Sequence, residues 1–193
     1  DKSVTAKGDV VFAGNPVFIA KPGIELSDLR GRLKFVNDQI EIKQATAKWL
    51  GMPVQISLKG EKKSRLYNTQ LELALEADSA VLHHHLGGLF ATQFEGKTTL
   101  NSQVDLAFGE RGFSHEAQVS SDLEGVTSHL PEPYHKTAEQ QVALRAQIQG
   151  DDISNLIMAQ LDNGLYFNAI FDNTSKKLSN AHLILGEQNL GLN

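Results

Sequence analysis

The sequence predicts an all-β protein built as an antiparallel meander, with one short helix near its middle. Apolar and polar side chains alternate with a period of two over most of the chain. Turn-forming residues separate the alternating runs, and a single segment has helical spacing instead. Because successive side chains of a strand point to opposite faces of a sheet, each run has one apolar and one polar face.

The alternating runs follow one another along the chain and are separated by polar turns. The runs lie at residues 31–35, 39–43, 54–59, 70–75, 100–108, 142–149, 165–171 and 183–185. The turn formers lie at residues 37–38, 60–64, 109–112, 162–164 and 173–176. Short turns between alternating runs favour hairpins, so we expect roughly a dozen strands, most of them paired with their neighbours in sequence.

One segment, 78–91, departs from this period. Asp78 can cap the N-terminus of a helix, and the glycines at 87 and 88 end it early. The apolar residues at helical spacing are Leu82, Leu86, Leu89 and Phe90. We predict a short helix that covers one end of the sheet and joins two sections, 1–77 and 96–193.

The chain is expected to be a single fragment, 1–193, of a longer repeating β-protein. It begins at Asp1 without an initiator methionine, and it starts and stops inside patterned segments. A signal peptide or anchor helix is not recognisable at its start.

The apolar face of such a sheet needs a cover, and one short helix is too small to supply it. A β-sandwich, a closed barrel, or a sheet curled into a U whose apolar concave side meets a ligand would each solve this problem. The alternation alone leaves these three open. In the U-shaped case the groove-lining candidates are Leu33, Phe35, Ile40, Ile42, Val54, Ile56, Leu58, Leu71, Leu73, Leu75, Leu100, Val104, Leu106, Phe108, Val142, Leu144, Ile148, Leu165, Phe167 and Phe171.

Composition and motifs argue against several classes of function. Eighteen Lys and Arg against 23 Asp and Glu give a net charge of -5, which does not suit a nucleic-acid partner. The three histidines at 83–85 diverge by about 100° per residue on a helix and do not converge on one metal. The sequence has no cysteine, nucleophile elbow, phosphate loop or dinucleotide fingerprint. We therefore expect no enzyme, no cofactor and no metal site.

Two stretches carry a family resemblance. Leu29–Gly60 contains a strand, a polar turn, a second strand, and then the segment Leu50–Val54 (LGMPV) that leads into a third. Ser121–Lys136 contains Leu130–Pro133 (LPEP) and is followed by Gln141–Leu144. Together they resemble the large AsmA-like envelope proteins of Gram-negative bacteria, of the YhdP type within the TamB/AsmA superfamily.

This resemblance implies a U-shaped, taco-like β-groove without catalytic residues. It implies a section of a bridge-like phospholipid conduit between the inner and outer membranes, which shields acyl chains and supports the outer-membrane permeability barrier. The location would be the periplasm, with the full-length protein anchored in the inner membrane outside this fragment. The alternative is a structural or chaperone-like envelope assembly module that binds other proteins through its sheet edges.

Overall fold

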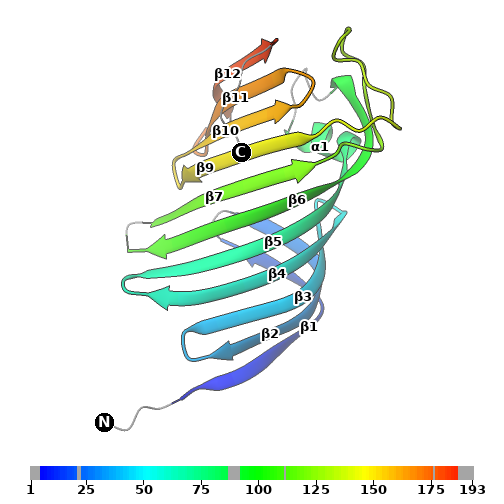
Figure 1. The fold of residues 1–193 in the computed structure, drawn as a ribbon. Helices are drawn as coiled ribbons and strands as arrows, with labels where there is room; N and C mark the ends of the chain where they lie inside the picture. Colours follow the sequence, from blue (N-terminus) through cyan, green and yellow to red (C-terminus); the bar gives the residue numbers. More distant parts are fainter. Residues whose placement is uncertain (1–4, 21–22, 87–91, 111, 176, 187–193) are drawn as a thin grey trace.

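The computed structural model describes residues 5–20, 23–86, 92–110, 112–175 and 177–186. They form one sheet of twelve strands and one helix (Figure 1). The elements are β1 (Lys7–Ile19), β2 (Ile24–Val36), β3 (Gln39–Trp49), β4 (Met52–Lys63), β5 (Leu66–Asp78), α1 (Ser79–Leu86), β6 (Phe94–Gly109), β7 (Gly112–Ser121), β8 (Val126–Ser128), β9 (Leu144–Asp151), β10 (Ser154–Leu161), β11 (Leu165–Asp172) and β12 (Lys177–Leu185).

The strands pair in sequence order from β1 to β7 and then from β9 to β12, and β8 pairs with β6 beside this path. Every pairing among the described strands is antiparallel. The predicted antiparallel meander with one short helix is therefore confirmed.

The sheet is a single open layer, and the alternatives of a sandwich and a barrel are wrong. Its two edge strands, β1 and β12, do not meet. Apart from β8, which pairs with β6, each strand of the path pairs with the strand next to it in the order, and no second sheet lies over this one among the described strands. Apart from the bent parts of β1 and β2, the sheet is uncurled, so this stretch of chain does not by itself wrap into the expected U.

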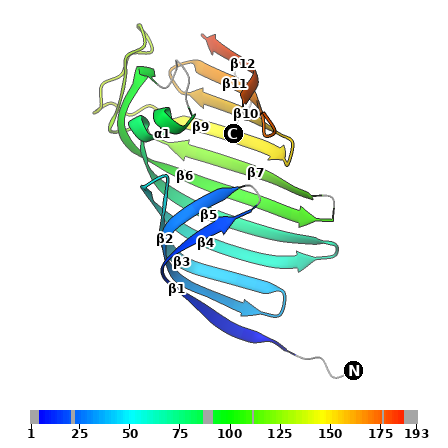
Figure 2. The ribbon, with the colours of Figure 1, turned by 180° about the vertical axis from the view of Figure 1, so that it is seen from behind.

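Within the open sheet, β1 and β2 each bend partway along their length. Beyond the bend they lie behind the other strands in the view of Figure 1 and in front of them in Figure 2. The bend falls where the pairing register shifts between Ala13 and Val17. Gly14 and Asp28 both have positive φ there, at 97° and 53°, and an ion pair of 2.8 Å joins Asp28 to Arg30. β-Bulges of this kind bend a strand and increase its twist locally.

The main hydrophobic cluster lies on one face of β2 to β5. Its most buried members are Ala45, Met52 and Ala77, which are 2%, 3% and 3% exposed. Val17 and Leu26, beyond the bend, pack against it. Among the described residues no large side chain is fully buried, as expected when one layer of strands has no second layer over it.

The predicted helix is confirmed as α1, which contacts β5 and β6. The Asp78 carboxylate accepts a hydrogen bond of 3.0 Å from the Ala80 N–H, so Asp78 is the N-cap. Val81 and Leu82 pack against the main cluster. The expected helix end and the residues Leu89 and Phe90 lie outside the described residues.

Some boundaries differ from the prediction. The turn between β4 and β5 lies at residues 64–65 and not 60–64, because pairing continues to Lys63 and Leu66. Val142 precedes β9 and is not part of a strand. β1, β7, β8 and β10 were not predicted as separate alternating runs.

Candidate functional site

The candidate groove-lining residues share one face of the sheet, which we call the apolar face. All of them except Val142 lie on strands. The pairing register sets Leu71 beside Val104, and Ile148 beside Ile157, so the apolar residues form rows that cross the strands.

A pocket of about 340 Å³ opens on the apolar face beside α1, and we call it the apolar pocket. It includes four of the predicted residues: Leu100, Leu144, Leu165 and Phe167. Sequence reasoning missed other lining residues, because they come from α1, the start of β6, β8, β10 and the 122–143 connection: Leu82, Phe94, Leu123, Val126, Ala159 and Leu161. A concave, mostly apolar site with few polar groups is the usual form of a binding site for small apolar ligands.

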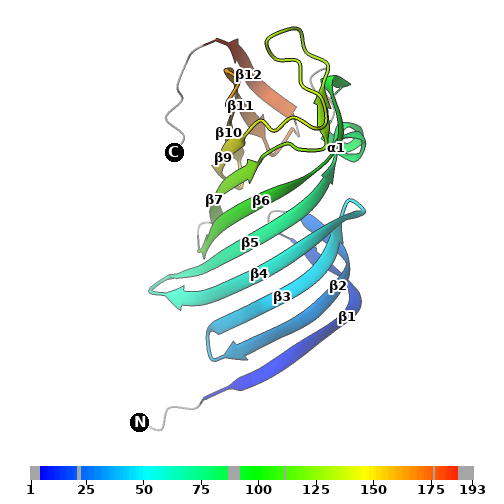
Figure 3. The same ribbon diagram turned by 45° about the vertical axis from the view of Figure 1, so that its right-hand side comes forward.

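The 122–143 connection forms one wall of this pocket. Figure 3 shows the connection and α1 at the same end of the long strands. Its residue Leu123 joins Leu161 and Leu165 in a second hydrophobic cluster, against which Leu130 and Tyr134 pack. The stretch that carried the family resemblance therefore has a structural role at the pocket.

Lys136 holds this connection together from inside. It is only 3% exposed, and its ammonium donates hydrogen bonds to the carbonyl oxygens of Val126, Leu123 and Thr137 at 2.6, 2.7 and 3.0 Å. Burial lowers the pKa of Lys136, and nearby carboxylates, first among them Asp122, partly oppose this. Three acceptors match the three N–H groups of an ammonium, which explains how a buried lysine is tolerated without a contacting carboxylate.

Two glycines allow the connection to approach β6 closely. Gly96 and Gly125 have positive φ, at 124° and 87°. A Cβ on Gly96 would overlap the Gly125 carbonyl oxygen, and a Cβ on Gly125 would overlap the carbonyl oxygen of Lys97. Both positions therefore require glycine for its backbone conformation and for space.

We expect Gly96→Ala to lower the free energy of unfolding by about 3 kcal/mol, since it combines an unfavourable φ with a backbone clash. Gly51→Ala is the matched control, because Gly51 has a φ of 82° with nothing within 4 Å of its Cβ position. It should cost only about 1 kcal/mol. Urea unfolding of both variants checks this, and equal losses would contradict a close contact at Gly96.

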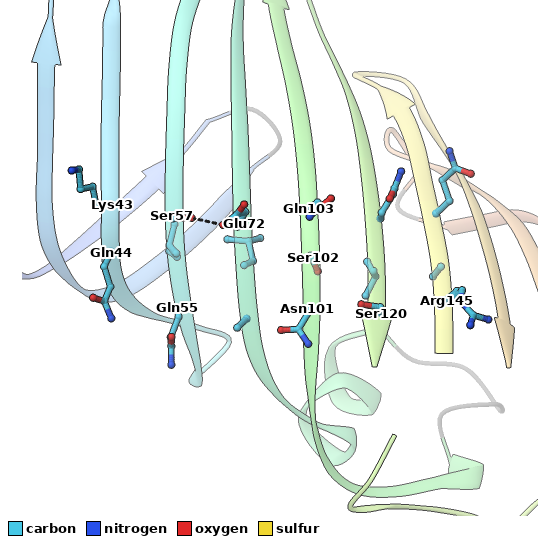
Figure 4. Close-up of a pocket in the computed structure, with 17 residues that line it drawn as sticks. Lys43, Gln44, Gln55, Ser57, Glu72, Asn101, Ser102, Gln103, Ser120 and Arg145 are labelled. Carbon is cyan, nitrogen blue, oxygen red and sulfur yellow. Dashed lines mark hydrogen bonds between the residues drawn. The ribbon is translucent and has the colours of Figure 1, made fainter. Parts of the chain in front are cut away.

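The opposite face of the sheet is polar and also hollowed. A hollow of about 750 Å³ spans β3 to β9, and Figure 4 shows its hydroxyl, amide and charged side chains, including Gln55, Asn101 and Gln103. Ser57 donates a hydrogen bond of 3.2 Å to Glu72 within it. Such a lining is readily hydrated and offers no cover to hydrocarbon.

The apolar face has a polar margin near the ends of its strands away from α1. Register places Thr69, His115 and Asn155 in one row across the sheet, together with Gly60, Gly150 and Leu106, which lies between Thr69 and His115. His115 Nδ1 and Asn155 Oδ1 are buried and have no hydrogen-bond partner among the described residues. We call Thr69, His115 and Asn155 the polar margin.

Burial lowers the pKa of His115 below its ordinary 6.5, although Asn155 and Asp151 partly oppose the shift. Unfolding removes the burial, so between the folded pKa and 6.5 the unfolded chain binds more protons than the folded one. Stability should therefore fall as the pH falls from 6.5 through the folded pKa, and this component should level off below it.

Urea unfolding at pH 7.5 and 5.5 tests this. The loss of stability between the two pH values should be smaller in His115→Gln than in the unmodified chain. His135→Gln, at an exposed histidine, should behave like the unmodified chain. An identical loss in His115→Gln would show that His115 is not desolvated.

Among the described residues, the histidines and carboxylates form no metal-binding cluster. The three histidines on α1 are exposed, and no three His, Asp or Glu side chains within the described ranges are gathered where they could hold a metal ion. Among the described elements no helix is long and apolar enough to cross a bilayer.

Fold and surface together define a class: a single-layer antiparallel β-protein that presents one apolar face and a pocket beside a short helix. The sequence matches the YhdP protein family model over residues 1–193. The chain belongs to the YhdP family, as the resemblance implied. It is 27% identical over 173 residues to the intermembrane phospholipid transporter YhdP of Escherichia coli (strain K12).

That alignment covers 86% of this chain and 13% of the E. coli protein, so the chain spans a small part of the relative that it matches. No solved structure matches the chain.

Proposed function

We propose that this chain is one section of a bridge-like phospholipid conduit in the periplasm, and that acyl chains travel along its apolar face. The observation that carries the proposal is the continuity of that face from β1 to β12 in a sheet with two open edges. Membership of the YhdP family and the phospholipid transport for which the E. coli relative is named support it. In the full-length protein, neighbouring sections and an inner-membrane anchor would complete the conduit and help to support the outer-membrane permeability barrier.

The apolar face would lower the main barrier to moving a phospholipid through water. Exposing an acyl chain costs about 0.8 kcal/mol per methylene, or about 13 kcal/mol for a chain of about sixteen carbons. An apolar surface lined by Leu, Val, Ile and Phe would remove most of this cost while the headgroup stays hydrated. The proposal includes no nucleophile, proton transfer or cofactor.

The size of the sheet suits a section and not a complete bridge. Its main path has eleven strands, and ten gaps of about 4.8 Å make roughly 48 Å. Both edges expose side chains of the apolar face: Val10 on β1, which pairs with Leu33, is 42% exposed, and Leu178 and Leu185 on β12 are 52% and 54% exposed. Further strands of a longer protein would pair with these edges and extend the apolar face.

The proposal is tested by extracting lipid from the purified chain and quantifying it by mass spectrometry. We expect phospholipid well above the amount carried by an unrelated soluble protein purified in parallel. Phospholipid at that background level would refute conduction by this section.

The exposed edges also favour a second candidate function, an assembly module that binds other envelope proteins by β-augmentation. Photocrosslinkers on the outward edge of β12 discriminate between the two candidates. Capture of defined envelope proteins by a chain that carries no lipid would favour the module.

A further inference from the structure

We propose that a bound phospholipid lies along the strands, with the end of its acyl chain in the apolar pocket and its headgroup at the polar margin. This proposal rests on the function proposed above, and it adds an orientation and a headgroup site. An apolar lane leads from the pocket to the polar margin, where buried polar atoms have no hydrogen-bond partner among the described residues. Gln160 Oε1, at the pocket end, is also without a partner in the part of the chain that the structure describes, but Gln160 pairs with Arg145 and Tyr166 and therefore lies on the polar face.

An apolar lane connects the pocket to the polar margin across β6 to β10. One complete row of this lane is Val104, Ala117, Ile148 and Ile157, in the pairing order of the strands. Ser102 on β6 interrupts the next row towards the pocket with a single small hydroxyl. A hydrocarbon chain lying along the strands would therefore meet apolar side chains over nearly all of its length.

The lane is a few ångströms longer than an acyl chain in one bilayer leaflet. On β9, Leu144 lines the pocket and Gly150 lies in the row of the polar margin. The two residues are six positions apart, or about 20 Å of extended strand. The hydrocarbon core of a bilayer is about 30 Å thick, so one leaflet contributes about 15 Å. A chain that ends in the pocket would thus bring its headgroup close to His115.

The polar margin offers the groups that a phosphate ester or glycerol ester needs. An N–H of the His115 ring can donate to an ester or phosphate oxygen, and its Nδ1 has no partner among the described residues. Asn155 Oδ1 is likewise unpartnered within the described chain and, as an acceptor, suits the ammonium or a hydroxyl group of a headgroup and not its phosphate, and Asn155 Nδ2 donates to Asn173 at 2.8 Å. Gly150 makes room for the Asn155 amide, because a Cβ at position 150 would overlap Asn155 Oδ1.

Aromatic rings surround the margin as they do at a membrane interface. Phe113 stacks on His115 with ring centroids 5.4 Å apart, and on Phe108 with centroids 5.9 Å apart. The pocket end is different. Its polar groups include Thr98, whose hydroxyl lies 3.0 Å from that of Ser121 and is paired with it. The geometry therefore favours a headgroup at His115 and hydrocarbon at the pocket.

Two photoreactive phosphatidylethanolamines test the orientation, one with a diazirine at the end of an acyl chain and one with a diazirine on the headgroup. Each is loaded onto the purified chain, irradiated, and mapped by peptide mass spectrometry. The chain-end probe should label residues 79–82 and 142–146 at least threefold more than residues 113–117 and 153–157, and the headgroup probe should show the reverse preference. Equal or inverted distributions would overturn the orientation but leave the conduit intact. Absence of all adducts would overturn both proposals.

Replacing His115 tests the headgroup site itself. His115→Leu replaces the imidazole with an apolar side chain in the row of the polar margin. We expect both probes to lose their threefold preference for one end of the lane. His135→Leu, at an exposed position, should preserve it. A preference that is unchanged in His115→Leu would overturn the assignment of the headgroup site.

Discussion

Lys136→Met is expected to destabilise the folded chain by roughly 2–4 kcal/mol, because it leaves buried carbonyl oxygens without a charged donor. Methionine fills a similar volume, so the loss reports hydrogen bonding and not a cavity. The carbonyl oxygens affected belong to Leu123, Val126 and Thr137. Since Leu123 and Val126 also line the apolar pocket, the variant should bind acyl chains more weakly as well.

Urea unfolding measures this effect, with Lys43→Met as the control. Lys43 is exposed on the polar face, and its replacement should change stability by less than about 0.5 kcal/mol. Equal midpoints for the two variants would mean that the Lys136 ammonium does not hold the 122–143 connection.

Val104→Asp is expected to reduce the phospholipid carried by the purified chain by at least about tenfold, since tenfold corresponds to only about 1.4 kcal/mol and a carboxylate against hydrocarbon costs more. Val104 lies in the middle of the apolar lane, between Leu71 and Ala117. Because the sheet has a single layer, the new carboxylate can still reach water. The fold should therefore survive with a loss of about 1–2 kcal/mol.

Gln103→Asp provides the matched control on the same strand. Gln103 is exposed on the polar face, so this variant adds the same charge without touching the apolar face, and it should keep its lipid. Far-UV circular dichroism and urea unfolding separate loss of lipid from loss of fold. An equal loss of lipid in both variants would indicate that added charge, and not its position, is responsible.

The sequence predicted the two faces and the helix start well, because these features depend on local pattern. Leu71, Leu73 and Leu75 alternate with polar residues, and such a pattern has one consistent solution in a sheet. Asp78 has a capping side chain directly before the helical segment, and the structure confirms its role.

Two of the missed strands, β1 and β10, have patterns that are not simple alternations. β1 contains register shifts around Asn15, which interrupt its period of two. β10 has apolar residues on both faces: Ile157 lies on the apolar face, whereas Leu156 points the other way and is 40% exposed. A run that is apolar on both sides cannot be distinguished from a buried helix by its period.

The pocket and the open sheet depend on contacts that no local pattern encodes. Leu82, Leu123 and Leu161 come from three separate segments of the chain and meet only in the fold. Lys136 is of a residue type that is usually exposed, so nothing in the sequence marked it as buried. The choice between an open sheet and a barrel depends on whether β1 meets β12, at opposite ends of the chain.

The most direct test of lipid travel along the apolar face is a photocrosslinker placed at each position from 100 to 106 of β6 in turn, in the full-length protein within cells. Lipid adducts should alternate, strong at Leu100, Val104 and Leu106 and weak at Asn101 and Asp105, because these residues point to opposite faces of the strand. Adducts that are uniform along the strand, or strongest at the polar positions, would contradict the account.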